Sequence, residues 1–259
     1  MQCIAVDWSG AVTGAARRIW MACARDGALT ALEAPGSREA VCRALLARRD
    51  DPTPTLVGLD FAFGMPGWYA HQRGWHDVTD VWRAARDEGE QWLRECAPPF
   101  WGRPGVRRPH PIDRGLRATE LADGGVRPKS VFQIGGAGSV GTGSIRGMHM
   151  LLTLRDAGWA VWPFDKPSSH TLVEIWPRHF TGPVIKSSAV HRAHWLQTSI
   201  VALRPDWLDL MHRSEDAFDA GVSAVRMSCM VMQDVLRTPA DPVTRLEGAI
   251  YRPELIQAA

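Results

Sequence analysis

The chain has 259 residues, of which 45% are hydrophobic and 22% are charged, and its formal net charge is +2 at pH 7. This length is enough for one good core with an insertion or a small second lobe, and no apolar stretch approaches the roughly 20 residues that span a bilayer. So weak a net charge does not argue for strong nonspecific binding to nucleic acid.

The five cysteines are scattered without CxxC pairing, so the sequence contains no zinc-knuckle motif. They are typical of small buried hydrophobic residues in a reducing compartment. Strand-like residues begin at Gln2 with no secretory signal before them. We therefore expect a cytoplasmic protein with no membrane segment.

The first quarter of the chain predicts three strands, a helix and a fourth strand. Asp26-Gly27 supplies the turn of a hairpin, and Ser37 is a plausible helix N-cap. The fourth strand is apolar almost throughout, as expected of a strand buried on both faces. RNase H-like folds open with this order of elements, and in them the first and fourth strands are parallel neighbours. The expected strands are residues 2–9, 17–24, 28–34 and 55–63, and the expected helix is 37–49.

The rest of the chain predicts an insertion followed by alternating strands and helices. The insertion, about residues 65–128, is irregular and contains one tryptophan-rich helix, but its apolar residues are too few for a separate core. We therefore expect one α/β domain with a mixed RNase H-like sheet, strand order 3-2-1-4-5, covered by helices on both faces. The expected helices are residues 78–96, a helix that the glycine-rich run 135–147 opens and that ends at 154, and residues 190–203 and 215–236. The expected strands are 159–164 and 171–176.

Carboxylates interrupt several of these apolar segments. Asp7 and Asp60 lie in strands that should be neighbours, and a lone buried charge costs several kcal/mol unless it is paired or bound to a metal. Asp216 and Asp219 are three residues apart, on one face of an apolar helix that must pack against the sheet. Glu174 is a fifth candidate from another strand. Because hard divalent cations take oxygen ligands, these residues predict a Mg²⁺ or Mn²⁺ site.

Each carboxylate also has a structural interpretation. A strand aspartate such as Asp7 or Asp60 is often paired with an arginine or a turn amide. Asp216 near a helix start is favoured by the helix dipole without any function. Glu174 is equally consistent with a ligand and with a structural partner. The four aspartates in this order favour the metal site over separate structural roles.

Six motifs follow one another along the chain. They are Val6-Asp7-Trp8-Ser9-Gly10-Ala11, Gly58-Leu59-Asp60-Phe61-Ala62-Phe63-Gly64-Met65-Pro66, Ser130-Val131-Phe132-Gln133, Gly143-Ser144-Ile145-Arg146-Gly147, Val173-Glu174-Ile175-Trp176-Pro177 and Glu215-Asp216-Ala217-Phe218-Asp219-Ala220. Together they resemble the "domain of unknown function 429" family of predicted RNase H-like nucleases. The resemblance spans nearly the whole chain, and it implies an acidic centre made by Asp7, Asp60 and the helix that carries Asp216 and Asp219.

Other residues are candidates for substrate contact. The glycine-rich run 135–147 is either a phosphate-binding loop or a flexible connection, and it lacks the Walker motif GxxxxGK(S/T). Residues 100–110 mix aromatic and basic side chains, as single-strand binders do, or form a proline-braced loop with packed aromatics and solvated arginines. The candidate substrate contacts are Ser9, Lys129, Arg146 and Lys186, with a structural ion pair or a surface charge as the alternative for the three basic residues.

Three functions remain open at this point. The first is a Mg²⁺- or Mn²⁺-dependent nuclease with Asp7, Asp60, Asp216 and Asp219 as its catalytic carboxylates and nucleic acid as its substrate. The second is a noncatalytic binding module of the same fold. The third is an ATP-dependent phosphotransferase of the actin-like or sugar-kinase type, which usually needs two such sheet halves. The oligomeric state cannot be inferred from the sequence.

Overall fold

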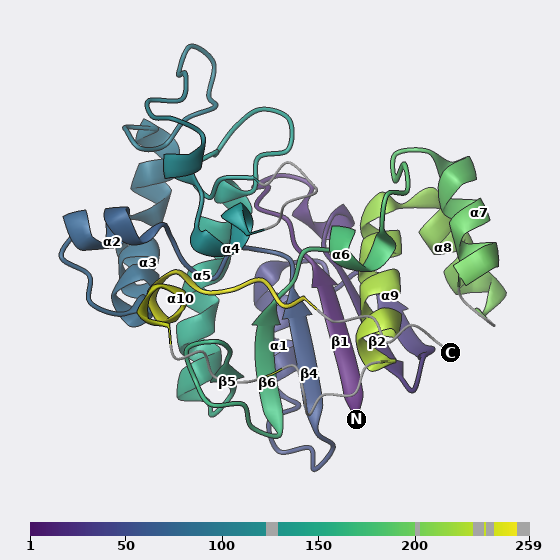
Figure 1. Cartoon of the computed structure of the whole chain (residues 1–259). Helices are drawn as coiled ribbons and strands as arrows, with labels where there is room; N and C mark the ends of the chain where they lie inside the picture. The colour runs from purple at the N-terminus through teal and green to yellow at the C-terminus, as the bar shows by residue number, and fades with distance from the viewer. Residues whose placement is uncertain (123–128, 200–202, 230–235, 237–240, 253–259) are drawn as a thin grey trace.

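The computed structural model describes residues 1–122, 129–199, 203–229, 236 and 241–252. A six-stranded mixed sheet stands at its centre, with helices on both faces (Figure 1). Strand β1 pairs with β4 in parallel and with β2 antiparallel, so the first and fourth strands are parallel neighbours as predicted. The strands are β1 (Gln2–Asp7), β2 (Trp20–Arg25), β3 (Ala28–Glu33), β4 (Thr55–Leu59), β5 (Ala160–Val161) and β6 (His170–Glu174).

The predicted strand order is wrong beyond the fourth strand. The sheet runs β3-β2-β1-β4-β6-β5, so β6 lies beside β4 and β5 lies at the edge. The segment predicted as strand 159–164 contributes only the two residues of β5, and Pro163 just beyond them has no N–H to donate to a strand ladder. The prediction of an α/β sheet covered on both faces is confirmed.

The hairpin forms as expected from its turn residues. Asp26 and Gly27 both have positive φ angles, 51° and 78°, which a two-residue hairpin turn of this hand requires. The Ser37 hydroxyl accepts a hydrogen bond from the backbone N–H of Ala40 at 3.1 Å, so Ser37 caps α1 (Arg38–Leu46). Local signals therefore fix these two elements.

Two cores form, one on each face of the sheet. Alternate residues of β1 point to opposite faces, so Ile4 and Val6 join one core while Cys3 and Ala5 join the other. Helix α1 and helix α5 (Gly141–Asp156) cover the first face, and α3 (Val78–Glu95) packs on α5. Helix α9 (Glu215–Ser228) crosses β1 and β2 on the second face, with α8 (Pro205–Arg213) outside it. Figure 1 shows the sheet between these two groups of helices.

The insertion shares the core of the first face. Its aromatic side chains, among them Tyr69, Trp82 and Phe100, pack in one cluster with residues of the sheet. The region also contains three short elements that the sequence did not predict. These are α2 (Gly67–Gln72), the 3₁₀ helix η2 (Asp113–Gly115) and α4 (Ala118–Leu121).

The C-terminal third adds helices beside α9. The predicted helix 190–203 is observed to Ser199, and its residues 200–202 lie outside the described residues. The predicted helix 215–236 is observed to Ser228, and residues 230–235 lie outside the described part. Also observed are η1 (Ala15–Arg17), α6 (Arg178–Thr181), α7 (Ala189–Ser199), α8 (Pro205–Arg213) and α10 (Pro242–Glu247).

In the described ranges, no helix combines the length and apolar character needed to cross a bilayer. All five cysteines have free thiols.

Candidate active site at the carboxyl ends of the strands

Asp7 and Asp60 lie side by side where two strands end. Asp7 is the last residue of β1, and Asp60 follows the last residue of β4. The register pairs Val6 with Leu59, and the Asp60 N–H donates to the Val6 carbonyl at 3.1 Å. Since adjacent strands are ~4.8 Å apart, the two aspartate backbones are direct neighbours.

Both side chains point to the face that α9 covers. The residues two and four positions before Asp7 in β1, Ala5 and Cys3, belong to the core beneath α9, and side chains alternate along a strand. Gly58, two positions before Asp60, faces the same way, because a Cβ there would meet Ile175 and the Met227 sulfur of α9 at 2.6 and 2.9 Å. The strand carboxylates therefore face the first turns of α9.

Helix α9 brings the third carboxylate to this point. Ser214 caps the helix by accepting from the Ala217 N–H at 3.1 Å, which fixes where its acidic first turns lie. The helix is buried almost all round because it is held between the sheet and α8. Asp219 is only 4% exposed, whereas Asp216, one turn earlier, is half-buried.

Burial and neighbouring acidic groups raise the pKa values of all three carboxyl groups. Burial raises the pKa of Asp7 well above its ordinary range, and the charge of Asp60 raises it further. Burial, followed by the charge of Asp219, raises the pKa of Asp60 to about 8. Burial also raises the pKa of Asp219 to about 6, although Lys186 acts in the opposite direction. This crowding of acidic groups favours a cation in their midst.

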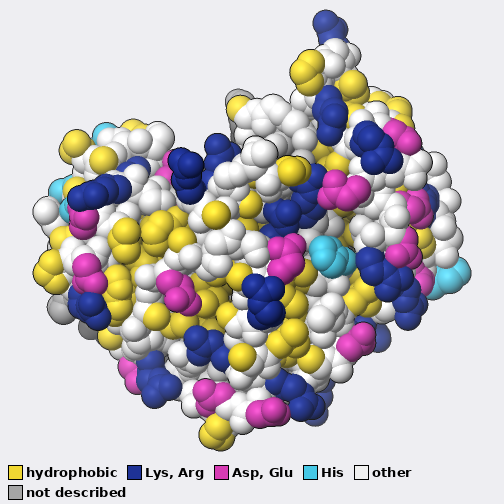
Figure 2. Space-filling model, turned by 180° about the vertical axis from the view of Figure 1, so that it is seen from behind, with side chains coloured by type: hydrophobic (Ala, Val, Ile, Leu, Met, Phe, Trp, Pro, Cys, Tyr) yellow, Lys and Arg dark blue, Asp and Glu magenta, His cyan; other side chains and the backbone are white. Residues whose placement is uncertain are grey.

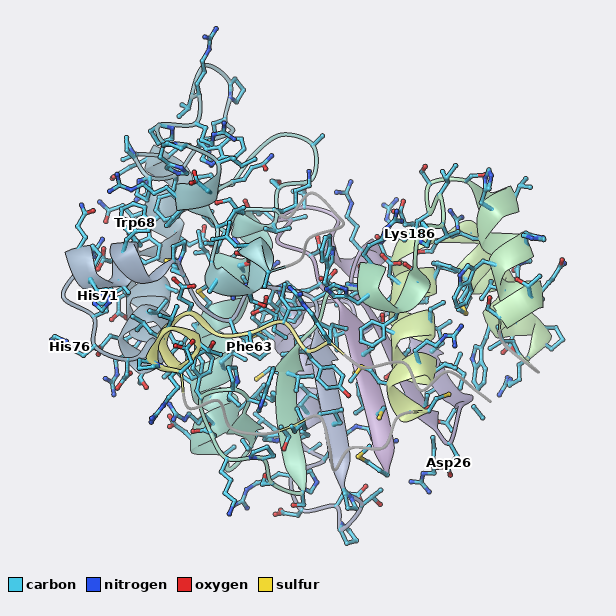
Figure 3. All side chains as sticks on the ribbon, in the orientation of Figure 1. Asp26, Phe63, Trp68, His71, His76 and Lys186 are labelled. Carbon is cyan, nitrogen blue, oxygen red and sulfur yellow. The ribbon has the colours of Figure 1, made fainter. Side chains whose placement is uncertain are left out.

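Lys186 is the cation that the structure places there. Its ammonium forms an ion pair with Asp219 Oδ2 and lies beyond the carboxyl ends of the strands, beside α6 and α9 (Figure 3). Burial lowers the pKa of Lys186, but the charges of Asp219, Asp60 and Asp7 outweigh this effect and raise it. The structural alternative considered for Lys186, an ion pair, is thus present, and Asp219 provides it.

The donor set suits a hard divalent cation. Carboxylate oxygens are the preferred ligands of Mg²⁺ and Mn²⁺, and the buried Asp219 Oδ1 has no hydrogen-bond partner among the described residues. However, no three His, Cys, Asp or Glu side chains of the described ranges are arranged as ready-made ligands of one ion. Binding a cation would therefore require side-chain movement at Asp7, Asp60 and Asp219, where Lys186 now supplies the positive charge.

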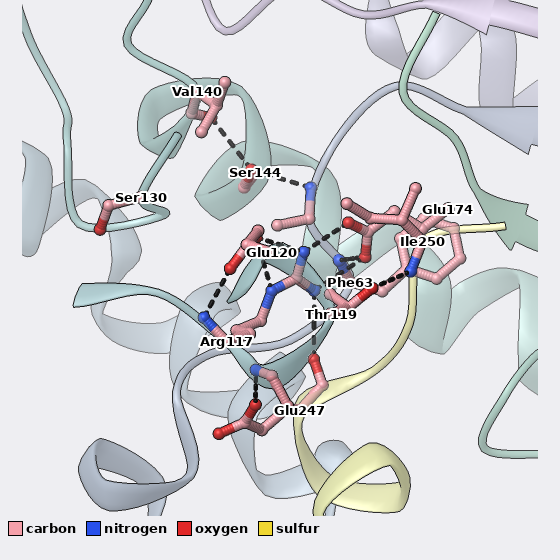
Figure 4. Close-up of polar contacts among 12 residues, drawn as sticks. Phe63, Arg117, Thr119, Glu120, Ser130, Val140, Ser144, Glu174, Glu247 and Ile250 are labelled. Atoms are coloured by element: carbon pink, nitrogen blue, oxygen red, sulfur yellow. Dashed lines mark hydrogen bonds and ion pairs between the residues drawn. The ribbon is translucent and has the colours of Figure 1, made fainter. Parts of the chain in front are cut away.

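Glu174 does not join this cluster, contrary to one of the two expectations for it. The parallel register pairs Glu174 with Leu59, one residue before Asp60, so its side chain points to the opposite face of the sheet. There Glu174 Oε2 accepts from Arg117 Nη1 and from the Phe63 N–H, both at 2.8 Å, and Oε1 accepts from Arg117 Nη2 at 2.5 Å (Figure 4). Glu174 is therefore a structural partner.

Arg117 is the centre of a buried network that sequence reasoning missed. It is 1% exposed and also donates to Glu120 Oε1 and, at 3.1 Å, to the Glu247 carbonyl (Figure 4). Glu247 in turn accepts from the Gly67 and Ala118 N–H groups. The network ties the insertion, β6 and α10 together. The only local signal was the i, i+3 spacing of Arg117 and Glu120 inside an irregular segment.

A cavity of about 490 Å³ opens beside the carboxylates, a size typical of small-ligand sites. Asp7, Asp60 and Asp216 line it, and so do two of the four predicted substrate contacts, Ser9 and Lys129. Its wall also includes an exposed basic residue from the N-terminal region and the beginning of α5. These further polar lining residues are Arg18, Ser139 and Thr142, and the charged residues Arg117, Glu120 and Glu174 of the buried network line the cavity as well.

Arg146 is outside this cavity lining, and its predicted phosphate contact is not supported. Its guanidinium pairs with Glu90 at 2.6 and 2.8 Å and donates to the Gly10 carbonyl. Gly10 is packed so tightly on α5 that a Cβ would lie 2.3 Å from the Gly143 nitrogen. Trp8 Nε1 donates to the Gly143 carbonyl at 3.0 Å. Arg146 therefore braces the loop after β1 against the start of α5.

The chain was compared with protein-family models, with curated proteins and with solved structures, and none of the three comparisons produced a match.

Proposed function

We propose that the chain is an RNase H-like protein of the "domain of unknown function 429" kind and acts as a divalent-metal-dependent nuclease. The observation that carries the proposal is the gathering of Asp7, Asp60 and Asp219, from β1, β4 and α9, beside a cavity. The arrangement of the first four strands, β3-β2-β1-β4 with β1 and β4 parallel, supports the RNase H-like assignment.

Asp7, Asp60 and Asp219 are the residues that would hold Mg²⁺ or Mn²⁺, and Asp216 lies at the cavity margin as an outer carboxylate. Such ions contribute charge stabilisation and water activation to phosphodiester hydrolysis. Lys186 keeps Asp219 ionised, because an ammonium at hydrogen-bond distance favours the carboxylate form. Lys129 and Ser9 line the same cavity and would contact a substrate phosphate. Five free thiols are consistent with a reducing cytoplasm.

Substitution of the strand carboxylates tests this proposal. Asp7→Asn and Asp60→Asn should each reduce the rate at which labelled DNA or RNA is cleaved in Mg²⁺ or Mn²⁺ by more than roughly 100-fold. A reduction of up to roughly 100-fold is typical when a residue that only supports a metal ligand is lost. Single-stranded, duplex and branched substrates should all be assayed. The matched control is Asp50→Asn, since the Asp50 side chain is 89% exposed. Cleavage at the wild-type rate in both site variants would rule out the assigned carboxylates.

The Lys186–Asp219 ion pair favours a second candidate, a noncatalytic binding module. In that interpretation Lys186 is the permanent counter-ion of the acidic cluster, and no ion is needed. Calorimetric titration of the wild-type protein with Mn²⁺ separates the two: binding that Asp60→Asn removes supports the nuclease, and no binding supports the module. The phosphotransferase alternative gains no support, because the described residues form a single sheet.

A further inference from the structure

A positively charged loop projects beside the cavity. Residues 102–109, named here the arginine arm, read Gly-Arg-Pro-Gly-Val-Arg-Arg-Pro and contain no acidic residue. Arg103, Arg107 and Arg108 are all exposed. In Figure 1 this part of the insertion projects at the top of the molecule, and Figure 2 shows Lys and Arg side chains on that projection and around the notch beside it.

The base of the arm is held by backbone contacts. The Trp101 N–H donates to the Phe132 carbonyl at 3.0 Å, and the Ile134 N–H donates to the Trp101 carbonyl at 2.9 Å. A turn closed by the Gly102 N–H and the Val106 carbonyl, 3.1 Å apart, begins the arm itself. Gly102, at φ 101°, lies against the backbone of Gly135. The arm is therefore anchored by these backbone contacts and by the packing of Trp101 and Val106 against the core.

This base continues directly into the cavity wall. Residues 132–134, which pair with Trp101, continue through Gly135 to Ser139 and Val140, and these last two residues line the cavity. The end of the Lys129 side chain, another lining residue, lies over Gly138 of the same segment, where a Cβ would be 2.9 Å from Lys129 Nζ. The segment that anchors the arm thus reaches the edge of the site where Lys129 lies, and Asp7, Asp60 and Asp216 line the site itself.

The aromatic side chains of this region are not free to stack with bases. Phe100 is 2% exposed and packs among Tyr69, Trp92 and Phe132. Trp101 is partly buried, with the Arg108 guanidinium 6.0 Å from its ring centre. Of the two ligand features that this segment offered, stacking rings and cations, only the cations are available. Contacts made by exposed guanidiniums with phosphates carry no base information.

We infer that the arginine arm binds the phosphate backbone of a nucleic-acid strand, without sequence preference, and guides it to the cavity. The inference rests on the proposed function, since it assigns nucleic acid as the polymer that the site acts on. Charge complementarity selects this partner: guanidiniums form bidentate pairs with phosphate oxygens, and a polyphosphate chain can contact the arm and Lys129 together.

The test is equilibrium binding in EDTA, measured by fluorescence anisotropy with labelled 20-mers of single-stranded DNA and RNA. We expect R103Q/R107Q/R108Q to weaken binding by about tenfold or more at moderate salt. The slope of log K against log salt should fall by about 2, because each lost phosphate contact removes about 0.7. R43Q/R83Q/R213Q removes the same charge from exposed arginines elsewhere and should bind like the wild type. Homopolymers of different base should bind alike.

Two results would overturn the inference: a wild-type protein that binds neither strand, or arm and control variants that bind equally. If the triple variant has an altered circular dichroism spectrum, R103Q/R107Q, which leaves Arg108 on Trp101, takes its place with an expected slope change of roughly 1.4. Because EDTA removes divalent ions, binding that depends on the arm supports the inference even where no strand is cut in Mg²⁺. Absence of cleavage together with arm-dependent binding would count against the nuclease activity and leave the inference about the arm standing.

Discussion

Replacing Arg117 by methionine should destabilise the fold more than any surface substitution. Its guanidinium is the cation between Glu120 and Glu174, and its bonds to them span 2.5–2.9 Å. All three side chains are less than 10% exposed. Removing one partner of a buried ion pair typically costs about 3–5 kcal/mol, because the remaining charge loses its compensation. Two carboxylates are left here, so we expect the upper part of that range.

The loss should shrink in acid. Burial raises the pKa of Glu120 above its ordinary value even with Arg117 present, although Arg117 counteracts it. Without Arg117 the pKa of the folded-state carboxyl rises further, so the folded state binds more protons than the unfolded state. Stability of the variant therefore increases as pH falls towards the ordinary glutamate pKa. The difference from the wild type should be smaller at pH 5.5 than at pH 7.5.

Urea unfolding followed by tryptophan fluorescence measures both effects. Arg83→Met, at a side chain that is 59% exposed, is the matched control and should change the free energy of unfolding by no more than about 0.5 kcal/mol. The double variant R117M/E174Q should recover part of the loss, because one of the two uncompensated charges is gone. A loss below about 1 kcal/mol for R117M, or one that is equal at the two pH values, would refute the network as described.

Two predictions concern the acidic cluster. Because the pKa of Asp60 is raised to about 8 and that of Asp219 to about 6, the folded state holds protons that the unfolded state has released. In EDTA, the free energy of unfolding should therefore fall as pH rises from about 4 to about 8, and Asp60→Asn should make this dependence on pH weaker. Urea unfolding that shows stability rising over this pH range would contradict the prediction. Lys186→Met should tighten Mn²⁺ binding by roughly tenfold or more, since a like charge at ~4 Å costs a few kcal/mol. Calorimetric titration with Mn²⁺ measures the affinity, and Lys166→Met, which replaces an exposed lysine, is the control. Weaker Mn²⁺ binding by the Lys186 variant would contradict the prediction and show that this lysine supports the site.

The aspartates of the candidate site could be identified from sequence because their context is local. Asp7 and Asp60 stand at the ends of apolar segments that are buried on both faces, and such segments place their polar ends at the edge of a sheet. Asp219 lies one turn into a helix whose start is marked by Ser214. The hairpin turn and the Ser37 cap follow from the same kind of short-range chemistry.

The partners of these residues were decided by tertiary structure. Glu174 lies in a strand that is apolar on both faces, so the sequence did not fix its register against β4, and a shift by one residue would turn the side chain to the other face. Arg117 and Lys186 lie outside regular periodic segments and reach Glu174 and Asp219 across 57 and 33 residues. Periodicity and capping act over a few residues, whereas ion pairs between distant segments form only when the whole chain has packed.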